Sequence, residues 1–233
     1  MDGSAVMRWE TVCVVSGGLD SVVLGHMVRR DTNGPHLWLG FDYGQRHVRE
    51  LEHADALAAT LGVTWRVIDL RTVGALLGGD ALTGAHAVPH GHYAHPSMAV
   101  TVVPNRNAIM LTIAYGIASA AGATLVATGV HAGDHWVYPD CRPEFAQAMM
   151  TMQTVALDGL HTPRLYTPFL HSSKADIVSL GARIGVPMHA TWSCYEGGVW
   201  HCGRCGTCVE RREAFDRAGV ADHTKYQDIG GIS

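Results

Sequence analysis

The sequence predicts an α/β protein in which helices cover a doubly wound parallel sheet, with a small metal-binding knuckle near the C-terminus. Two observations lead to this expectation. Apolar, β-branched runs alternate with segments of helical periodicity through the first half of the chain. Four of the six cysteines then cluster between positions 194 and 208. We therefore expect a main domain over residues 1–190 and a metal-binding segment over residues 191–233.

The first expected strand is the apolar run Thr11–Val15, which ends at the glycine-rich loop Ser16–Ser21. Apolar residues recur at helical spacing directly after the loop. A strand, a glycine-rich turn and a helix N-terminus together form an anion cradle, because glycines let backbone N–H groups turn inward and the helix dipole favours negative charge. Asp20 would repel a bare phosphate, so it indicates a bound Mg²⁺. The alternative is a tight turn in which Ser16 caps the helix.

The following elements extend the same alternation. Further strands are expected over residues 37–41, 64–70 and 124–128, and helices over residues 48–61 and 106–121. Ligands of such sheets bind at the carboxyl ends of the strands, which is where the loop lies. Residues 78–100 lack periodicity and contain His86, His90, His92 and His95. That stretch predicts a loop that covers a substrate, with a histidine metal site as the alternative.

Composition narrows the class of protein. The 233 residues carry a net charge of −4, so no overall basic field favours nucleic acid. No apolar run approaches the ~20 residues that a membrane span needs. The N-terminus lacks the apolar core of a signal peptide, and we expect a cytoplasmic protein. Neither the Walker pattern nor the dinucleotide fingerprint G-x-G-x-x-G occurs, which disfavours both of those nucleotide-binding classes.

The clustered cysteines have the spacing C-x₇-C-x₂-C-x₂-C. Four thiolates suit a tetrahedral Zn²⁺ with no open position, so the predicted role of the metal is structural. Disulfides and an iron–sulfur cluster are the alternatives. We expect nearby arginines to offset the negative charge. The predicted zinc ligands are Cys194, Cys202, Cys205 and Cys208, and the compensating cations are Arg204, Arg211 and Arg212.

The two remaining cysteines lie outside the cluster. Cys13 is expected to be a small buried apolar residue. Cys141 is expected to serve packing, with a nucleophile as the alternative.

Several motifs occur in a fixed order along the chain. After the S-G-G-x-D-S loop come residues 42–47, 103–107, 129–134, 138–145 and 191–195, and then the remaining cysteines and Arg211. Together, over roughly residues 11–215, they resemble the 7-cyano-7-deazaguanine synthase family of the PP-loop ATP pyrophosphatase superfamily. One departure is Asn105, where the family more often has a small residue such as glycine, and we expect a local change of the loop there.

The resemblance implies an ATP-dependent ligase that forms C–N bonds. Such an enzyme converts 7-carboxy-7-deazaguanine and ammonia to 7-cyano-7-deazaguanine (preQ0) in queuosine-type biosynthesis, by adenylating first the carboxylate and then the amide. It further implies a homodimer, small-molecule substrates, no membrane partner and no direct nucleic-acid binding. An adenylating enzyme for tRNA thiolation is one alternative. A nucleic-acid-binding zinc module is another, with Arg217 and the arginines near the cysteines as its contacts.

The resemblance also implies which residues form the site. ATP would be held by Val15, Ser16, Gly17, Gly18, Leu19, Asp20 and Ser21. Charge at the α-phosphate would be neutralised by Arg106, Arg142 and Lys174. Asp134 or Asp140 would pair with the guanine-like edge. Tyr43, His131 or Tyr138 would stack on the heterocycle. Arg46 and Asn107 complete the candidates, and surface exposure or packing is the alternative for each of them.

Overall fold

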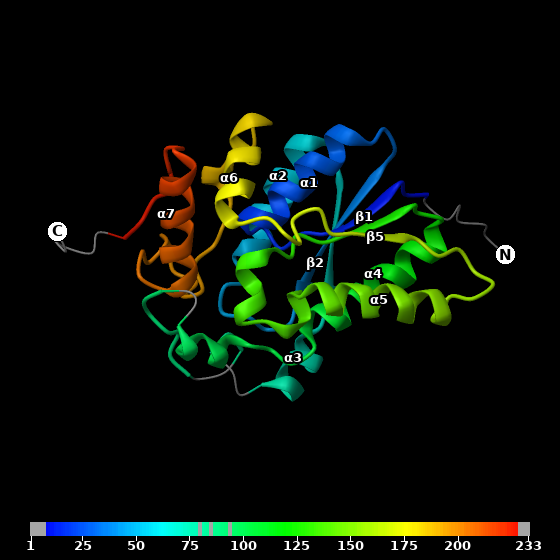
Figure 1. The fold of residues 1–233 in the computed structure, drawn as a ribbon, viewed down its shortest axis with the longest axis horizontal. Coiled ribbons are helices and arrows are strands. Elements are labelled where there is room, and N and C mark those ends of the chain that lie inside the picture. Colours follow the sequence, from blue (N-terminus) through cyan, green and yellow to red (C-terminus); the bar gives the residue numbers. More distant parts are fainter. Residues whose placement is uncertain (1–7, 79–80, 84–85, 93–94, 228–233) are drawn as a thin grey trace.

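The computed structural model describes residues 8–78, 81–83, 86–92 and 95–227. Within these residues, five parallel strands form one sheet in the order β3-β2-β1-β4-β5, which confirms the predicted doubly wound architecture (Figure 1). The strands are β1 (Thr11–Val14), β2 (His36–Asp42), β3 (Thr64–Asp69), β4 (Leu125–Ala127) and β5 (Arg164–Tyr166). In register, Thr11 of β1 pairs with His36 on one side and with Leu125 on the other.

Two helical layers cover the sheet. One face carries α1 (Leu19–Asp31), α2 (Glu50–Leu61) and α6 (Lys174–Arg183), and the other carries α4 (Arg106–Ala121) and α5 (Pro143–Ala156) (Figure 1). Each layer buries its own apolar cluster against the strands. Trp38 of β2 belongs to the first cluster and Leu39 to the second, because successive strand residues point to opposite faces.

The helices and strands expected from the sequence overlap elements of the structure. The last predicted helix coincides with α4, and each predicted strand overlaps an observed one. The prediction omitted the elements α3 (Arg71–Leu77), α5, β5, α6 and α7 (Gly206–Ala218), together with several short 3₁₀ turns. β5 is only three residues long, so it is too short for alternation to signal it.

The cysteine-containing segment is built onto the main domain. Helix α7 begins directly after Cys205, and its Phe215 packs in the apolar cluster of α1 and α6. Within the described residues, no helix is long and apolar enough to cross a membrane.

Described residues between positions 86 and 92 lie beside this segment. Val88 packs against the buried cysteines, and His90 pairs with Glu196 at 3.0 Å between Nε2 and Oε1. Nε2 of His92 lies 3.5 Å from a carboxylate oxygen of Glu213 on α7. His90 and His92 thus face carboxylates, whereas Nδ1 of His95 contacts the Ser97 hydroxyl at 2.9 Å.

Candidate active site

A pocket opens between β1 and β4, where the order in which successive strands are added to the sheet reverses. From β1 the strands proceed to β2 and β3, and then return to β4 on the other side of β1. The pocket lies at the carboxyl ends of these strands, the place where doubly wound sheets bind ligands. Its volume is about 200 Å³. Its walls come from residues 14–21, the end of β2, residues 128–130, the start of α4 and residues 192–195.

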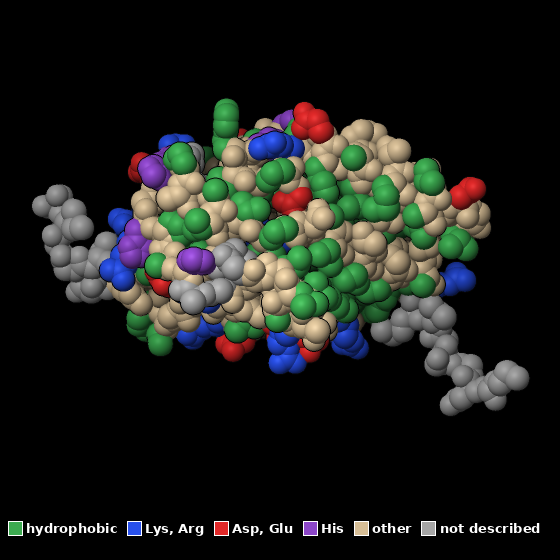
Figure 2. Space-filling view, turned by 90° about the horizontal axis from the view of Figure 1, so that it is seen from below, with side chains coloured by type: hydrophobic (Ala, Val, Ile, Leu, Met, Phe, Trp, Pro, Cys, Tyr) green, Lys and Arg blue, Asp and Glu red, His purple; other side chains and the backbone are tan. Residues whose placement is uncertain are grey.

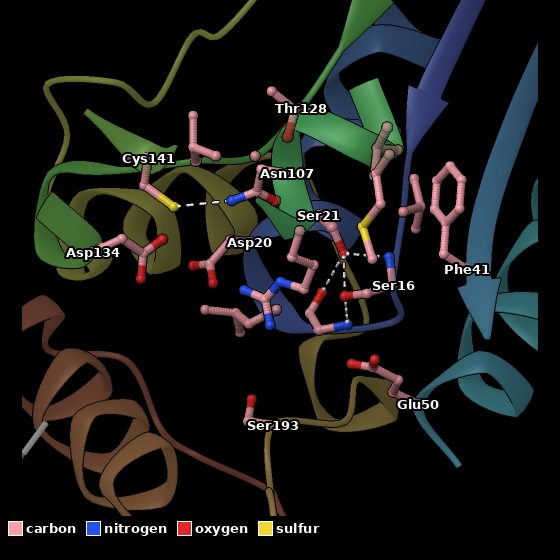
Figure 3. Close-up of a pocket in the computed structure, with 18 of the residues that line it drawn as sticks. Ser16, Asp20, Ser21, Phe41, Glu50, Asn107, Thr128, Asp134, Cys141 and Ser193 are labelled. Carbon is pink, nitrogen blue, oxygen red and sulfur yellow. Dashed lines mark hydrogen bonds between the residues drawn. The ribbon is translucent and has the colours of Figure 1, made fainter. Parts of the chain in front are cut away.

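The phosphate loop Ser16–Ser21 forms the floor of this pocket and is closed by its own hydroxyl groups. The Ser21 hydroxyl donates to the Gly18 carbonyl at 3.1 Å and accepts the Ser16 N–H at 3.2 Å. The Gly18 N–H in turn donates to the Ser16 hydroxyl at 3.2 Å (Figure 3). Gly18, and not Ser16, occupies the N-cap position of α1, and no side chain caps the helix. The loop therefore has the form of an open anion cradle.

Gly17 explains why the loop needs glycine. Its φ of +99° lies in the left-handed region that favours glycine. A Cβ built at this position would also lie only 1.9 Å from the carbonyl oxygen of Glu50. The N–H of Trp192 donates to the Gly17 carbonyl at 2.9 Å. The loop is thus packed between the start of α2 and the cysteine segment.

One side of the loop, which we call the charged flank, consists of Asp20, His131, Asp134, Lys174 and Glu210. Nζ of Lys174 lies 3.3 Å from Oδ2 of Asp20 and 2.6 Å from Oε2 of Glu210. Burial alone would raise the pKa of Asp20, but the ammonium of Lys174 outweighs it and the pKa lies below its ordinary value. The Asp20 carboxylate is therefore ionised at neutral pH.

His131 lies behind this pair and is almost wholly buried. Its Nδ1 accepts the N–H of Gly133 at 3.1 Å, so its proton is on Nε2. Nε2 lies 3.7 Å from Oδ2 of Asp20 and 3.5 Å from Oδ2 of Asp134. Oδ1 of Asp20 is buried and has no hydrogen-bond partner among the residues that the structure describes, which leaves one acceptor of the charged flank available for a cation.

The opposite side of the loop, which we call the neutral flank, consists of Gln45, His47 and Glu50. Burial raises the pKa of Glu50 to about 8, and burial with the nearby Arg106 lowers the pKa of His47 to about 3. The Gln45 amide donates to Oε1 of Glu50 at 3.4 Å, and Nε2 of His47 lies 3.5 Å from the same oxygen. The carboxyl of Glu50 is therefore mainly protonated at pH 7.

A third wall combines one cation with aromatic rings. A guanidinium N–H of Arg106 donates to the Tyr43 hydroxyl at 3.4 Å, and the guanidinium lies 5.5 Å from the centre of the Tyr138 ring. The Tyr138 hydroxyl contacts those of Thr101, at 2.7 Å, and Tyr195, at 3.3 Å. Burial raises the pKa of Tyr43 to about 12, so its hydroxyl stays neutral. This wall suits a flat, polar ring that carries an acid group.

The predicted site residues divide into those that line the pocket and those that lie behind or outside it. The lining contains Val15, Ser16, Gly18, Leu19, Asp20, Ser21, Tyr43, Arg106, Asn107, Asp134, Tyr138 and Lys174. Gly17 and His131 are buried directly behind the lining.

Three predicted residues lie apart from the pocket. Arg46 is exposed. Arg142 is exposed too, and its Nε donates to the His135 carbonyl at 2.8 Å. The Asp140 carboxylate accepts the backbone N–H of Asn107 at 2.9 Å, at the start of α4. Asn105, the residue before α4, has a φ of 58°, a left-handed conformation that asparagine tolerates better than most residues.

Sequence reasoning did not select several residues of the site. Glu50, Thr128, Ser193, Tyr195 and Thr207 line the pocket, and Glu210 stands behind Lys174. Tyr195 belongs to one of the recognised motifs, so that motif was a usable signal. Glu50 follows the 42–47 motif by three residues, and Glu210 comes two residues after a predicted metal ligand.

Cys141 also lines the pocket, beside the start of α4. Its Sγ accepts from the Asn107 amide at 3.2 Å (Figure 3). Burial raises the pKa of the thiol far above its ordinary value, and the carboxylates of Asp134 and Asp140 raise it further. A nucleophilic cysteine requires the opposite shift, so this environment favours the packing role.

The four C-terminal cysteines form a buried cluster beside the pocket. Their sulfurs lie within 4.8 Å of one another, and all are free thiols. The N–H of Cys202 points to Sγ of Cys194 at 3.3 Å, and the N–H of Cys205 to Sγ of Cys202 at 3.2 Å. Four close sulfurs, two of which receive backbone N–H donors, fit a tetrahedral thiolate site for a metal ion.

The buried Arg211 holds several oxygen atoms around the cysteine segment. Its guanidinium donates to the hydroxyls of Thr191 and Ser193, at 2.8 and 3.0 Å, and to the Met188 carbonyl at 2.7 Å. A further contact joins it to Asp222, with Nε 3.7 Å from the carboxylate. Arg211 therefore ties the segment that enters the cysteine cluster to α7, and its hydrogen bonds go to hydroxyl and carbonyl oxygens.

Known proteins match the chain over nearly its whole length. The family model described as "Queuosine biosynthesis protein QueC" matches residues 10–219. The 7-cyano-7-deazaguanine synthase of Paracoccus denitrificans (strain Pd 1222) is 60% identical over 219 residues, covering 94% of each chain. The synthase of the same name from Brucella ovis is 57% identical with the same coverage.

Solved structures match at much lower identity. NMN synthetase from Francisella tularensis aligns with a TM-score of 0.47 and 16% identity, over 92% of this chain and 74% of the other. The U34-tRNA thiolase NcsA from Methanococcus maripaludis aligns with a TM-score of 0.45 and 12% identity, over 99% and 80%. The family model and the two synthases together show that this chain belongs to the 7-cyano-7-deazaguanine synthase (QueC) family.

Proposed function

We propose that the protein uses ATP to convert 7-carboxy-7-deazaguanine and ammonia to 7-cyano-7-deazaguanine. The observation that carries this proposal is the open phosphate loop at the reversal point of the sheet, in a chain 60% identical to a synthase of that name. The tRNA-thiolation alternative loses support, because the family match covers residues 10–219 and therefore the whole site.

The first half of the reaction activates a carboxylate. Its oxygen attacks the α-phosphorus of ATP, and pyrophosphate leaves to give an acyl adenylate. Ammonia then attacks the carbonyl carbon, the bond to AMP breaks, and one proton leaves the nitrogen to give the amide. Adenylation is needed because an ionised carboxylate is a poor electrophile whose oxide is a poor leaving group.

The second half repeats the same activation. The amide oxygen attacks the α-phosphorus of a second ATP, and pyrophosphate leaves again. The nitrogen loses its remaining protons, the C–O bond to AMP breaks, and the nitrile forms. One pocket serves both halves because the acid and its amide present an oxygen at the same place.

The residues of the pocket have separate roles in this proposal. The phosphate loop holds the outer phosphates through backbone N–H groups and the hydroxyls of Ser16 and Ser21. Lys174 and Arg106 offset negative charge that develops at the α-phosphate. Tyr43 and Tyr138 supply aromatic faces for the heterocycle, and Asp134 accepts two parallel N–H donors from its guanine-like edge. These roles use residues that line one pocket.

Two metal ions accompany this chemistry. We assign Mg²⁺ to Asp20, whose buried Oδ1 has no hydrogen-bond partner in the described part of the chain and is suited to a hard cation. We assign a structural Zn²⁺ to Cys194, Cys202, Cys205 and Cys208, which offer it four sulfurs and leave no open position. When bound, the magnesium would neutralise phosphate charge and the zinc would hold the wall of the pocket that carries Trp192 and Ser193.

The organisation of the protein follows from the same proposal. We take residues 1–190 as the nucleotide-binding domain and residues 191–233 as a zinc-binding segment, in a cytoplasmic homodimer. Support for self-association comes from exposed hydrophobic side chains on α3 and α5, including Leu76, Met152 and Val155. Hydrophobic side chains gather on the face seen in Figure 2, and an exposed apolar patch often marks an interface.

Product analysis tests the proposed function. The purified protein is incubated with 7-carboxy-7-deazaguanine, ammonium and MgATP, and the products are identified by mass spectrometry. We expect the nitrile, with AMP and pyrophosphate from each activation. Absence of both amide and nitrile would contradict the assignment. Formation of ADP and phosphate in place of AMP would contradict adenylation.

Asp20→Asn tests the charged flank in this reaction. We expect turnover to fall by about 100-fold while the fold persists, because the amide removes the ionised ligand for the cation beside the phosphates. Asp55→Asn is the matched control, since this carboxylate is exposed on α2. Loss of the circular dichroism spectrum in Asp20→Asn would instead assign Asp20 a structural role.

A further inference from the structure

Glu50 lies at the point where the phosphate loop meets helix α2. It is the first residue of this helix, and its carbonyl blocks any side chain at Gly17. Its own side chain also lines the pocket and is only 11% exposed. Figure 3 shows the carboxyl of Glu50 close beneath the loop that carries Ser16. A buried acid thus supports the very segment that has to receive phosphate.

The groups that face this carboxyl come from three parts of the chain. Gln45 and His47 approach it from the segment before α2, at 3.4 and 3.5 Å. Ser16 interacts with it from the loop, and Arg106 acts on it from α4. Within the described residues, His47 is its only ion-pair partner within 4.0 Å. Burial with Arg106 nearby keeps the His47 ring neutral. The charge of Arg106 lowers the pKa of Glu50 but does not outweigh the burial of its carboxyl.

The contrast with Asp20 shows that the vicinity of the loop does not by itself decide the charge of an acid. Asp20 has an ammonium 3.3 Å away, whereas the groups that contact the Glu50 carboxyl are an amide, a hydroxyl and a neutral ring, and Arg106 acts on it without an ion pair within 4.0 Å among the described residues. An ionised Glu50 would place a negative charge without a close ion-pair partner next to bound phosphates. In a buried pocket such like charges repel strongly.

We propose that Glu50 is a positioning residue for nucleotide binding that acts as a neutral carboxylic acid beneath the phosphate loop, so that ATP binds the form with a protonated Glu50 and its ionisation expels the nucleotide. This inference rests on the proposed function, since it takes ATP as the ligand of the loop. Thermodynamic linkage then requires ATP binding to draw a proton onto Glu50 wherever the free protein has lost it.

The experiment measures MgATP binding by isothermal titration calorimetry between pH 6.5 and 9.5. In the wild type, we expect the dissociation constant to rise towards tenfold per pH unit above about pH 8, the pKa of the Glu50 carboxyl. In Glu50→Gln, which keeps a neutral polar group of the same shape, we expect a flat profile. Glu52→Gln, an exposed neighbour on the same helix, is the matched control and should follow the wild type.

A second measurement counts the proton directly. Titrations at pH 8.5 in two buffers of different ionisation enthalpy should show uptake of about three quarters of a proton per ATP by the wild type, and none by Glu50→Gln. Two neighbouring groups do not change charge in this pH range, because the pKa of Tyr43 is raised to about 12 and that of His47 is lowered to about 3. The pKa of Lys174 is also raised, since the carboxylates of Asp20 and Glu210 outweigh its burial.

The outcomes separate this inference from the function it rests on. A wild type that binds no ATP at any pH contradicts the proposed function. A wild type that binds ATP with no proton uptake and a flat profile overturns the inference alone, even if Glu50→Gln fails to fold. Equal pH profiles in the wild type and Glu50→Gln also overturn it, because a purely structural Glu50 predicts that result.

Discussion

The charged flank and the neutral flank border the same loop, yet the same chemical group behaves in opposite ways in them. On the charged flank, the pKa of Asp20 is lowered, because Lys174 outweighs the cost of burial. On the neutral flank, burial raises the pKa of Glu50 to about 8, because His47 and Gln45 bring no charge. Burial alone disfavours both carboxylates, so the partner decides which of them is ionised.

This difference assigns separate tasks to the two flanks. An ionised acid beside a phosphate is useful only with a cation between them, which fits the proposed Mg²⁺ at Asp20. A neutral acid can contact the loop without repelling the nucleotide. The flanks also differ in origin, since Glu50 comes from the segment that follows β2, whereas Lys174 and Glu210 come from α6 and α7. The charged flank therefore depends on the C-terminal segment.

The largest expected effect comes from breaking the anchor of that segment. Cys208→Ser removes one sulfur from the cluster at the start of α7, the helix that carries Glu210. Structural zinc contributes of the order of 10 kcal/mol in small zinc domains, so we expect loss of the metal and local unfolding of α7. Hydrogen exchange should increase in α7 and in residues 191–205 before it increases in the neutral flank.

Metal analysis of the same samples provides the control. Wild type should contain close to one zinc per chain, and chelation should reproduce the exchange pattern of Cys208→Ser. A brown, iron-containing protein would contradict the assignment of zinc. Unchanged exchange after complete removal of the metal would contradict its structural role.

The next effect comes from removing the cation of the charged flank. Lys174→Met leaves Asp20 and Glu210 without their shared ammonium in a site where all three side chains are mostly buried. Removing one partner of a buried ion pair costs about 3–5 kcal/mol. We therefore expect the free energy of unfolding, measured in urea, to fall by about this amount.

A second substitution tests the cause of that loss. Lys174→Met combined with Glu210→Gln should regain part of the stability, because one of the two uncompensated acids is gone. Strictly additive losses from the two single variants would contradict the coupling of Lys174 and Glu210. The exposed Lys225 provides the control, since Lys225→Met should change stability by no more than about 0.5 kcal/mol.

The smallest effect is the pH dependence of stability on the neutral flank. The pKa of Glu50 is about 8 in the folded protein, against an ordinary value of 4.5. The folded state therefore binds more protons than the unfolded state between these values, and stability falls as pH rises through this range. From pH 7 to pH 8, wild type should lose about 1 kcal/mol more than Glu50→Gln. Parallel stability curves for the two proteins would contradict the raised pKa.

Short-range pattern was enough to predict much of the fold and part of the site. The helix Arg106–Ala121 has an apolar periodicity, and the strand before Ser16 is a continuous apolar run. Glycines follow both elements in the sequence. Asp20 and the four cysteines stand in compact motifs whose chemistry depends on spacing. β5 escaped prediction because three residues carry too little pattern. Arg142 was a candidate by motif, but its side chain is exposed and contacts the His135 carbonyl.

By itself, the sequence determined the family, the α/β class, the glycine-rich loop and the set of four clustered cysteines, because each depends on local motifs or on their order along the chain. Only the tertiary structure decided which acids are ionised. Asp20 meets Lys174 from a distant helix, whereas the carboxyl of Glu50 contacts an amide and a neutral ring and Arg106 does not outweigh its burial. A pKa depends on burial and on charges a few ångströms away, and neither is visible until the chain has folded.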